Sequence, residues 1–177
     1  SEPGDCFMKF SQGALIMYGS TGVCRVESIA PMPGSHGAEK ERLYYKLSPL
    51  FGSGVIYVPV DTQIYMRPVI SRQEALELIA RLPELREDHS LDTADRHSLG
   101  AVYQARIQSH DCETLAQLIK SLYLKQQAET SAGKHPYKID QDYLKKAAEL
   151  LHSELACALE IDVADVPQFI QSQLQKA

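Results

Sequence analysis

The stretch SRQEALELI, residues 71–79, divides the sequence into two halves with different hydrophobic periods. Its first four residues have the form of a capping box, in which the Ser71 side chain accepts a backbone N–H and Glu74 reaches back to the serine N–H. The apolar residues that follow have helical spacing, and Pro83 lies where this helix is expected to end. The second half of the chain is therefore expected to begin with a helix at Ser71.

The first half has the pattern of short strands. Residues Val23–Ile29 alternate between two sets of side chains, which is typical of a half-buried strand. They follow a turn at Gly19–Gly22, where the glycines are free to take positive φ. Four further strands are predicted, over residues 14–18, 42–47, 55–60 and 64–67. Five such short strands favour a small, curled barrel, and Pro59 marks an edge strand or a strand end.

The second half continues with helical spacing after the capping box. A second helix is expected near residues 95–108, and Asp111 is expected to cap a third helix with one apolar stripe. Asp140 is expected to cap a fourth helix, and a last helix follows Asp165 with Pro167 in its first turn. The apolar faces of these helices must meet in a bundle.

The predicted fold class is therefore α+β, with an N-terminal small Tudor/SH3-like β-barrel followed by an all-helical C-terminal bundle. The expected domains are residues 8–70 for the barrel and residues 71–177 for the helical domain. Residues 1–7 resemble no structural element, and Met8 has the position of a natural start.

The composition is that of a globular protein, with 44% hydrophobic and 23% charged residues. No apolar run reaches the roughly 18 residues that span a bilayer, and the first ten residues lack the pattern of a signal peptide. A cytoplasmic location is therefore expected. The four cysteines have no metal-binding or redox spacing, so free thiols are expected, buried at Cys24, Cys112 and Cys157.

The sequence lacks the motifs that an enzyme of a familiar class would carry. Gly52–Gly54 is a fragment of a glycine-rich loop without a helix start, and no zinc-protease motif is present. Ser20 belongs to a hairpin turn rather than to a strand-to-helix elbow. The six histidines lie apart and are expected at the surface. We therefore expect no catalytic residues, no cofactor, no bound metal and no small-molecule substrate.

Three segments of the first half resemble the RNA-polymerase-interacting domain of the CarD family, which transcription-repair coupling factors share. These segments are YGSTGVCRVE at residues 18–27, IYVPVD at residues 56–61 and RPVIS at residues 67–71. In the second half, LIKSLYLK at residues 118–125 and ELA at residues 154–156 are similar to motifs of CarD proteins. The resemblance spans residues 8–175 and implies a bacterial transcription regulator.

The resemblance implies that an edge strand of the barrel pairs with the β subunit of RNA polymerase, so that backbone hydrogen bonds provide affinity. If Ile56 and Val58 face inward, alternation turns Val55 and Tyr57 outward, although Tyr and Val on strands often simply pack a core. The candidate polymerase-binding residues are Tyr45, Val55, Tyr57 and Pro59.

The resemblance also implies that the helical domain contacts promoter DNA at the upstream edge of the transcription bubble and modulates open-complex stability. The formal charge of −5 does not indicate nucleic-acid binding, but residues 120–146 hold six lysines against three acidic residues. The candidate DNA-binding residues are Arg96, His97, Lys120, Lys125, Lys145 and Lys146.

One departure from the family pattern leaves two hypotheses open. Many relatives insert a tryptophan wedge into the minor groove, whereas this sequence has no tryptophan and no aromatic residue other than histidine within residues 89–97. Either the basic candidates carry the DNA contact, or the protein is a polymerase-bound adaptor that binds other proteins and no DNA.

Overall fold

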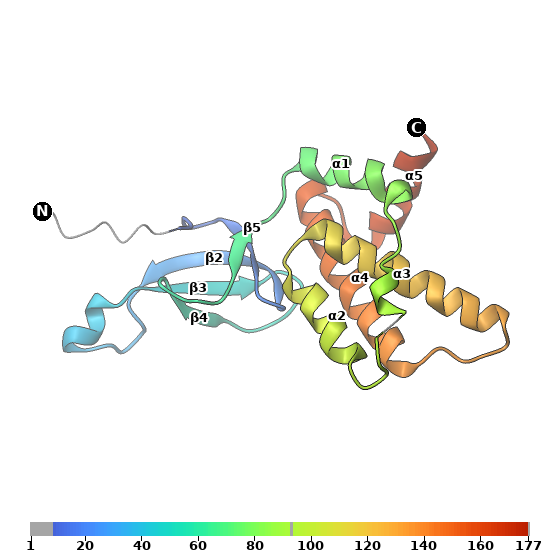
Figure 1. Cartoon of the computed structure of the whole chain (residues 1–177). Coiled ribbons are helices and arrows are strands. Elements are labelled where there is room, and N and C mark those ends of the chain that lie inside the picture. Colours follow the sequence, from blue (N-terminus) through green and yellow to red (C-terminus); the bar gives the residue numbers. More distant parts are fainter. Residues whose placement is uncertain (1–8, 93, 177) are drawn as a thin grey trace, which may run out of the picture. The chain divides into compact units, whose positions relative to one another are not determined.

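A computed structural model describes residues 9–92 and 94–176 of the chain. Its internal contacts divide the chain after Val69 into two compact units, here called the sheet unit and the helical unit (Figure 1). Cys6 and the expected domain start at Met8 lie outside the described residues. Among the described helices, none combines the length and apolar content that crossing a membrane requires.

The sheet unit is one antiparallel sheet with the strand order β4-β3-β2-β1-β5. Each strand predicted from the sequence is present, with ends that differ by at most two residues. The strands are β1 (Leu15–Tyr18), β2 (Gly22–Ala30), β3 (Tyr44–Pro49), β4 (Ile56–Pro59) and β5 (Met66–Pro68). The loop between β2 and β3 contains a short 3-10 helix, η1 (Gly37–Glu41).

The hairpin between β1 and β2 depends on glycine conformations that other residues rarely adopt. Gly19 has φ +47° and Gly22 has φ +100°, and the Thr21 N–H donates to the Tyr18 carbonyl at 3.0 Å. This tight turn brings Leu15 opposite Arg25 and so fixes the register of the two strands. The turn predicted from the sequence is confirmed.

All five strands contribute to the core of the sheet unit. Its buried residues are Phe10, Ile16, Cys24, Val26, Tyr45, Leu47, Val58 and Met66. Within the described residues, β4 pairs only with β3 and β5 only with β1, so the sheet is open and has two edges. The α+β class is confirmed, whereas closure into a Tudor/SH3-like barrel is not.

The described residues of the helical unit form five α-helices (Figure 1). They are α1 (Arg72–Arg81), α2 (Leu99–Gln108), α3 (Cys112–Ser131), α4 (Lys138–Leu159) and α5 (Val166–Gln175). Three 3-10 helices, η2 (Leu82–Glu84), η3 (His89–Leu91) and η4 (Val163–Asp165), lie between them. Leu91 in η3 is buried, so the segment between α1 and α2 is anchored to the core.

The long antiparallel pair α3 and α4 forms the centre of the helical unit. The helix α2 packs against both, and α1 packs against α4 and α5. The largest fully buried apolar side chains of the unit are Tyr103, Ile79, Leu118, Leu122, Leu155, Leu159 and Val166. The helical bundle predicted from the 3.6-residue period is thus the observed arrangement.

The helix starts follow the expected signals with one exception. The Ser71 Oγ accepts the Glu74 N–H at 3.1 Å, and the Glu74 carboxylate accepts the Ser71 N–H at 3.1 Å. The Asp111 carboxylate likewise accepts the Thr114 N–H at 3.1 Å. The prediction for Asp140 is wrong: the N-cap of α4 is Tyr137, and Asp140 lies fully buried in the first turn.

Glu154 is a second buried carboxylate on α4, with 1% of its surface exposed. One of its oxygens accepts the Ile70 N–H at 3.0 Å, and the other accepts the Cys112 Sγ–H at 3.1 Å. A buried carboxylate is tolerated only when such donors surround it. Glu154 therefore joins the first residue of the helical unit and the start of α3 to α4.

Candidate functional site

The outer strand β4 and the residue before it present two side chains to solvent. Val55 is 50% exposed and Tyr57 is 39% exposed, whereas Val58 is 3% exposed and belongs to the core. Ile56 is half-buried and packs against the same core. The alternation predicted from the sequence is therefore the observed one, and Val55 and Tyr57 face outward.

Among the residues that the structure describes, no strand pairs with β4 on the side away from β3. Val60 N–H donates to the Leu43 carbonyl at 3.1 Å, and Val58 lies opposite Tyr45 in the same register. Because alternate residues of an antiparallel strand face the partner, the N–H and C=O of Tyr57 point away from β3. Pro59 adds an outward carbonyl and no N–H. The edge of β4 thus offers the N–H of Tyr57 as a donor and the carbonyls of Tyr57 and Pro59 as acceptors.

Tyr45 does not belong to this surface, and its prediction as a polymerase-facing residue is wrong. Its side chain has no exposed area, its hydroxyl accepts the Phe10 N–H at 3.2 Å, and its ring lies edge-on to Phe10. The physical reason is cross-strand pairing: residues directly opposite in adjacent strands share a face, and Tyr45 is opposite the buried Val58. Pro59 is half-buried at the end of β4.

The other edge, β5, is blocked at several points. The bonds of its neighbours Tyr65 and Val69 to β1 turn the backbone groups of Met66 and Pro68 outward. Pro68 has no N–H, and its carbonyl accepts a hydrogen bond from Arg67 Nη1 at 3.1 Å. The Met66 carbonyl accepts from Lys9 Nζ at 3.5 Å. A proline and cationic side chains are common ways to protect an edge from strand addition.

The sequence of the sheet unit was compared with those of known protein families. Residues 10–70 match the family model of the CarD-like/TRCF RID domain. RID denotes an RNA-polymerase-interacting domain, so the match supports an interaction of the sheet unit with RNA polymerase. The matched range is roughly a third of the chain and ends where the helical unit begins. No curated protein matches the chain.

In the helical unit, Lys120 is bonded to the protein's own backbone. Its ammonium donates to the carbonyls of Leu82 at 3.4 Å, Pro83 at 3.3 Å and Leu85 at 2.7 Å. These carbonyls lie at and beyond the end of α1, where helical partners run out and a lysine is a common substitute. The prediction of Lys120 as a DNA contact is therefore not supported by its geometry.

Lys125 balances a buried charge. Its Nζ lies 2.9 Å from Asp140 Oδ2, and Asp140 has no exposed surface. Tyr103 donates its hydroxyl to the other oxygen of Asp140 at 2.6 Å. Burial, together with the hydrogen bond to Asp140, raises the pKa of Tyr103 far above its ordinary value. Since the carboxylate depends on this ammonium, Lys125 has a structural role that its sequence position did not reveal.

Lys145 and Lys146 lie on a face of α4 that carries both signs of charge. Lys145 is exposed and Lys146 is half-buried. Asp142 and Glu149 lie three or four residues from each of them, which makes them neighbours on the helix surface. The six lysines of residues 120–146 therefore do not form one basic surface.

Arg96 and His97 are exposed, and Arg96 stacks on an aromatic ring that the sequence analysis missed. The Arg96 guanidinium lies 4.4 Å from the ring centroid of Tyr137, and Lys125 Nζ lies 5.7 Å from the same centroid. Tyr137 remains 43% exposed. The available signal was the segment KHPYK at residues 134–138, which places an aromatic residue among basic ones in a loop.

Proposed function

We propose that this protein is a bacterial, cytoplasmic transcription regulator that acts by binding and has no catalytic site. Its sheet unit binds the β subunit of RNA polymerase, and its helical unit contacts promoter DNA near the upstream edge of the bubble, which modulates open-complex stability. The observation that carries the proposal is the match of residues 10–70 to the CarD-like/TRCF RID domain, together with the edge of β4, which has no strand partner beyond β3 within the described residues.

In the polymerase complex, a strand of the β subunit adds to β4. The Tyr57 N–H and C=O are the pair that receives it, and the Val55 and Tyr57 side chains contact the partner on the solvent-facing side of the sheet. The ladder ends at Pro59, which has no donor. The core shared by all five strands supports the assignment of the sheet unit to the Tudor-like kind.

In the DNA complex, the contact is made by Arg96, His97 and Tyr137. An exposed ring beside a guanidinium combines a surface on which a base stacks with a charge that attracts phosphate. Because Lys120 and Lys125 are bonded within the protein, they support this contact only indirectly.

A second candidate function is that of a polymerase-bound adaptor without DNA binding. The internal partners of Lys120 and Lys125 favour it, as does the formal charge of −5. In this case the helical unit binds another protein while the sheet unit keeps its polymerase contact.

The polymerase contact is tested with a fragment of the β subunit and calorimetry. Tyr57→Glu should weaken binding roughly 30-fold, since removal of an interface anchor commonly costs about 2 kcal/mol. Tyr65→Glu is the matched control, because Tyr65 is a 49% exposed tyrosine beside the blocked edge. Equal losses for both variants, with native amide spectra, would contradict the assignment of β4.

The DNA contact is tested with forked promoter DNA at several salt concentrations. Arg96→Ala should reduce the affinity and flatten the salt dependence by about one unit of slope, as expected for one lost phosphate contact. Tyr137→Ala should reduce the affinity with little change of slope, because stacking releases no counterions. Undetectable DNA binding by the intact protein at low salt would favour the adaptor.

A further inference from the structure

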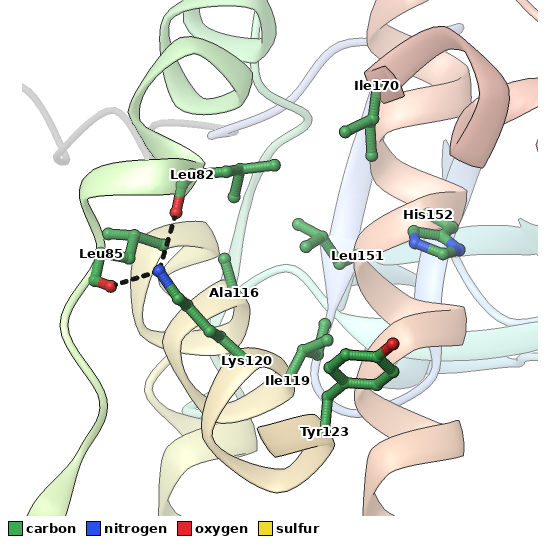
Figure 2. Close-up of a pocket in the computed structure, with 9 residues that line it drawn as sticks. All are labelled: Leu82, Leu85, Ala116, Ile119, Lys120, Tyr123, Leu151, His152 and Ile170. Carbon is green, nitrogen blue, oxygen red and sulfur yellow. Dashed lines mark hydrogen bonds between the residues drawn. The ribbon is translucent and has the colours of Figure 1, made fainter. Parts of the chain in front are cut away.

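Four elements of the helical unit enclose a cleft of about 240 Å³. Figure 2 shows the side chains around it, which come from η2 and the residue after it, from α3, from α4 and from α5. The lining residues are Leu82, Leu85, Ala116, Ile119, Lys120, Tyr123, Leu151, His152 and Ile170.

Most of this lining is apolar and part of it faces solvent. Ala116 and Leu151 are buried, whereas Leu82, Ile119 and Ile170 are half-buried. A dry cavity of about 150 Å³ holds one benzene ring in other proteins, so this cleft has room for one or two rings. It is too small for a helix or a strand of a partner, and its natural occupant is a small molecule.

The one cationic group of the cleft lining is poorly placed to hold an anionic ligand. The Lys120 stem crosses the wall, but its ammonium turns to the Leu82 and Leu85 carbonyls (Figure 2). Its N–H donors are therefore already directed to carbonyl oxygens of the protein and away from the cleft. An anion bound in the apolar interior would have to compete with these carbonyls and would lose its own hydration.

His152 is a half-buried polar group of the cleft that remains available for a hydrogen bond. Among the described residues, none forms a hydrogen bond or an ion pair with its ring. Burial lowers the pKa of His152 below its ordinary value, so the imidazole is neutral at pH 7. A neutral imidazole has one N–H donor and one nitrogen acceptor, and it can pair with a hydroxyl or a carbonyl.

We propose that the cleft binds an uncharged small molecule of one or two rings, with one polar group that hydrogen-bonds to His152. The ligand is bound and not converted. This inference is independent of the polymerase and DNA contacts, since no residue of either proposed contact lines the cleft. A bound ligand would join α3, α4, α5 and η2 and so stabilise the folded helical unit.

The experiment uses the intact protein and two probes, 2-naphthol and naphthalene, followed by the methyl resonances of Ile119 and Ile170. The shifts induced by 2-naphthol should saturate with a Kd of about 1 mM or tighter. His152→Leu should weaken 2-naphthol binding about tenfold, the usual effect of one hydrogen bond, and leave naphthalene binding unchanged. Shifts that fail to saturate, or equal affinity for the two probes in the unmodified protein, would overturn the proposal.

A filling variant tests the location. Ala116→Leu should occupy the cleft and reduce 2-naphthol affinity more than tenfold, because Ala116 lines the cleft and is buried. The matched control is Ala128→Leu, an exposed position on the same helix outside the cleft, which should bind as the unmodified protein does. If Ala116→Leu does not fold, contacts between the naphthol ring protons and the Ile119 and Ile170 methyls decide the matter. Absence of these contacts at saturation would overturn the proposal.

Discussion

The two units leave different kinds of group available to a partner. In the sheet unit, β4 exposes unpaired backbone groups at Tyr57, and its side chain is 39% exposed. In the helical unit, the long cationic side chains of α3 bond to the protein itself, Lys120 to three carbonyls and Lys125 to buried Asp140. A strand edge needs a partner to complete its ladder, whereas these lysines already have their partners.

This difference between an open strand edge and internally bonded lysines predicts how each unit responds to salt and to mutation. Backbone pairing at β4 involves no charged group, so polymerase binding through this edge should vary little with salt. Binding of DNA by exposed cations such as Arg96 must weaken as salt rises. Loss of an internal lysine should act on stability first and on binding second.

The largest expected effect is in the helical unit. Lys125→Met removes the ammonium and leaves the Asp140 carboxylate buried with one hydroxyl donor, which should lower the free energy of unfolding by about 3 kcal/mol. Urea denaturation followed by helical circular dichroism measures it. The double variant Lys125→Met with Asp140→Asn should recover part of the loss, because no unpaired charge remains. A single variant as stable as the unmodified protein would show that Lys125 is free to bind DNA.

A somewhat smaller effect is expected at the strand edge. Tyr57→Pro removes the outward N–H, while an edge strand tolerates proline where no ladder bond is lost. Polymerase binding should fall by about 1–2 kcal/mol, the contribution of a hydrogen bond and of the lost side chain. Calorimetry with the β-subunit fragment measures it, and Tyr57→Phe, which keeps both the ring and the N–H, is the control. Unchanged binding by Tyr57→Pro would mean that no strand adds at β4.

Substitution of Lys145 should affect DNA binding less than substitution of Arg96 does. Because Asp142 and Glu149 flank it on α4, Lys145→Gln should change DNA affinity less than twofold and leave the salt slope unchanged. Fluorescence anisotropy with labelled promoter DNA is precise enough for this comparison. A slope reduced by one unit would place Lys145 in the DNA contact and would weaken the argument from local charge.

The smallest expected effect concerns pH. The pKa of His152 lies below 6.5 in the folded protein because burial disfavours the imidazolium. The unfolded chain therefore binds the proton more readily, and the free energy of unfolding should fall as pH drops below about 6.5. Urea denaturation at pH 7.5 and 5.5 should show this loss for the unmodified protein and a smaller one for His152→Gln. Equal pH dependence in both would mean that His152 is protonated in the folded state.

The sequence was sufficient to predict the helices and strands, and to predict which side chains of the β4 region face outward, because both depend on local signals. Alternation turned Val55 and Tyr57 outward, and the capping box at Ser71 marked the start of α1. The prediction from sequence was wrong for Tyr45. The side of the sheet on which Tyr45 lies is set by Val58, the residue opposite it in the adjacent strand. The prediction also failed for the lysines, since the partners of Lys120 and Lys125 are many residues away along the chain.

The hydrogen bond between Ile70 and Glu154 can form only late in the synthesis of the chain. Ile70 precedes its partner by 84 residues, and the same carboxylate also receives the Cys112 thiol. A ribosome that adds 5–20 residues per second needs roughly 4–17 s to cover that distance. During this interval the nascent sheet unit has all its strands, while the boundary of the helical unit still lacks its acceptor. A chain cut short before residue 154 would therefore contain the whole sheet unit and an incomplete helical unit.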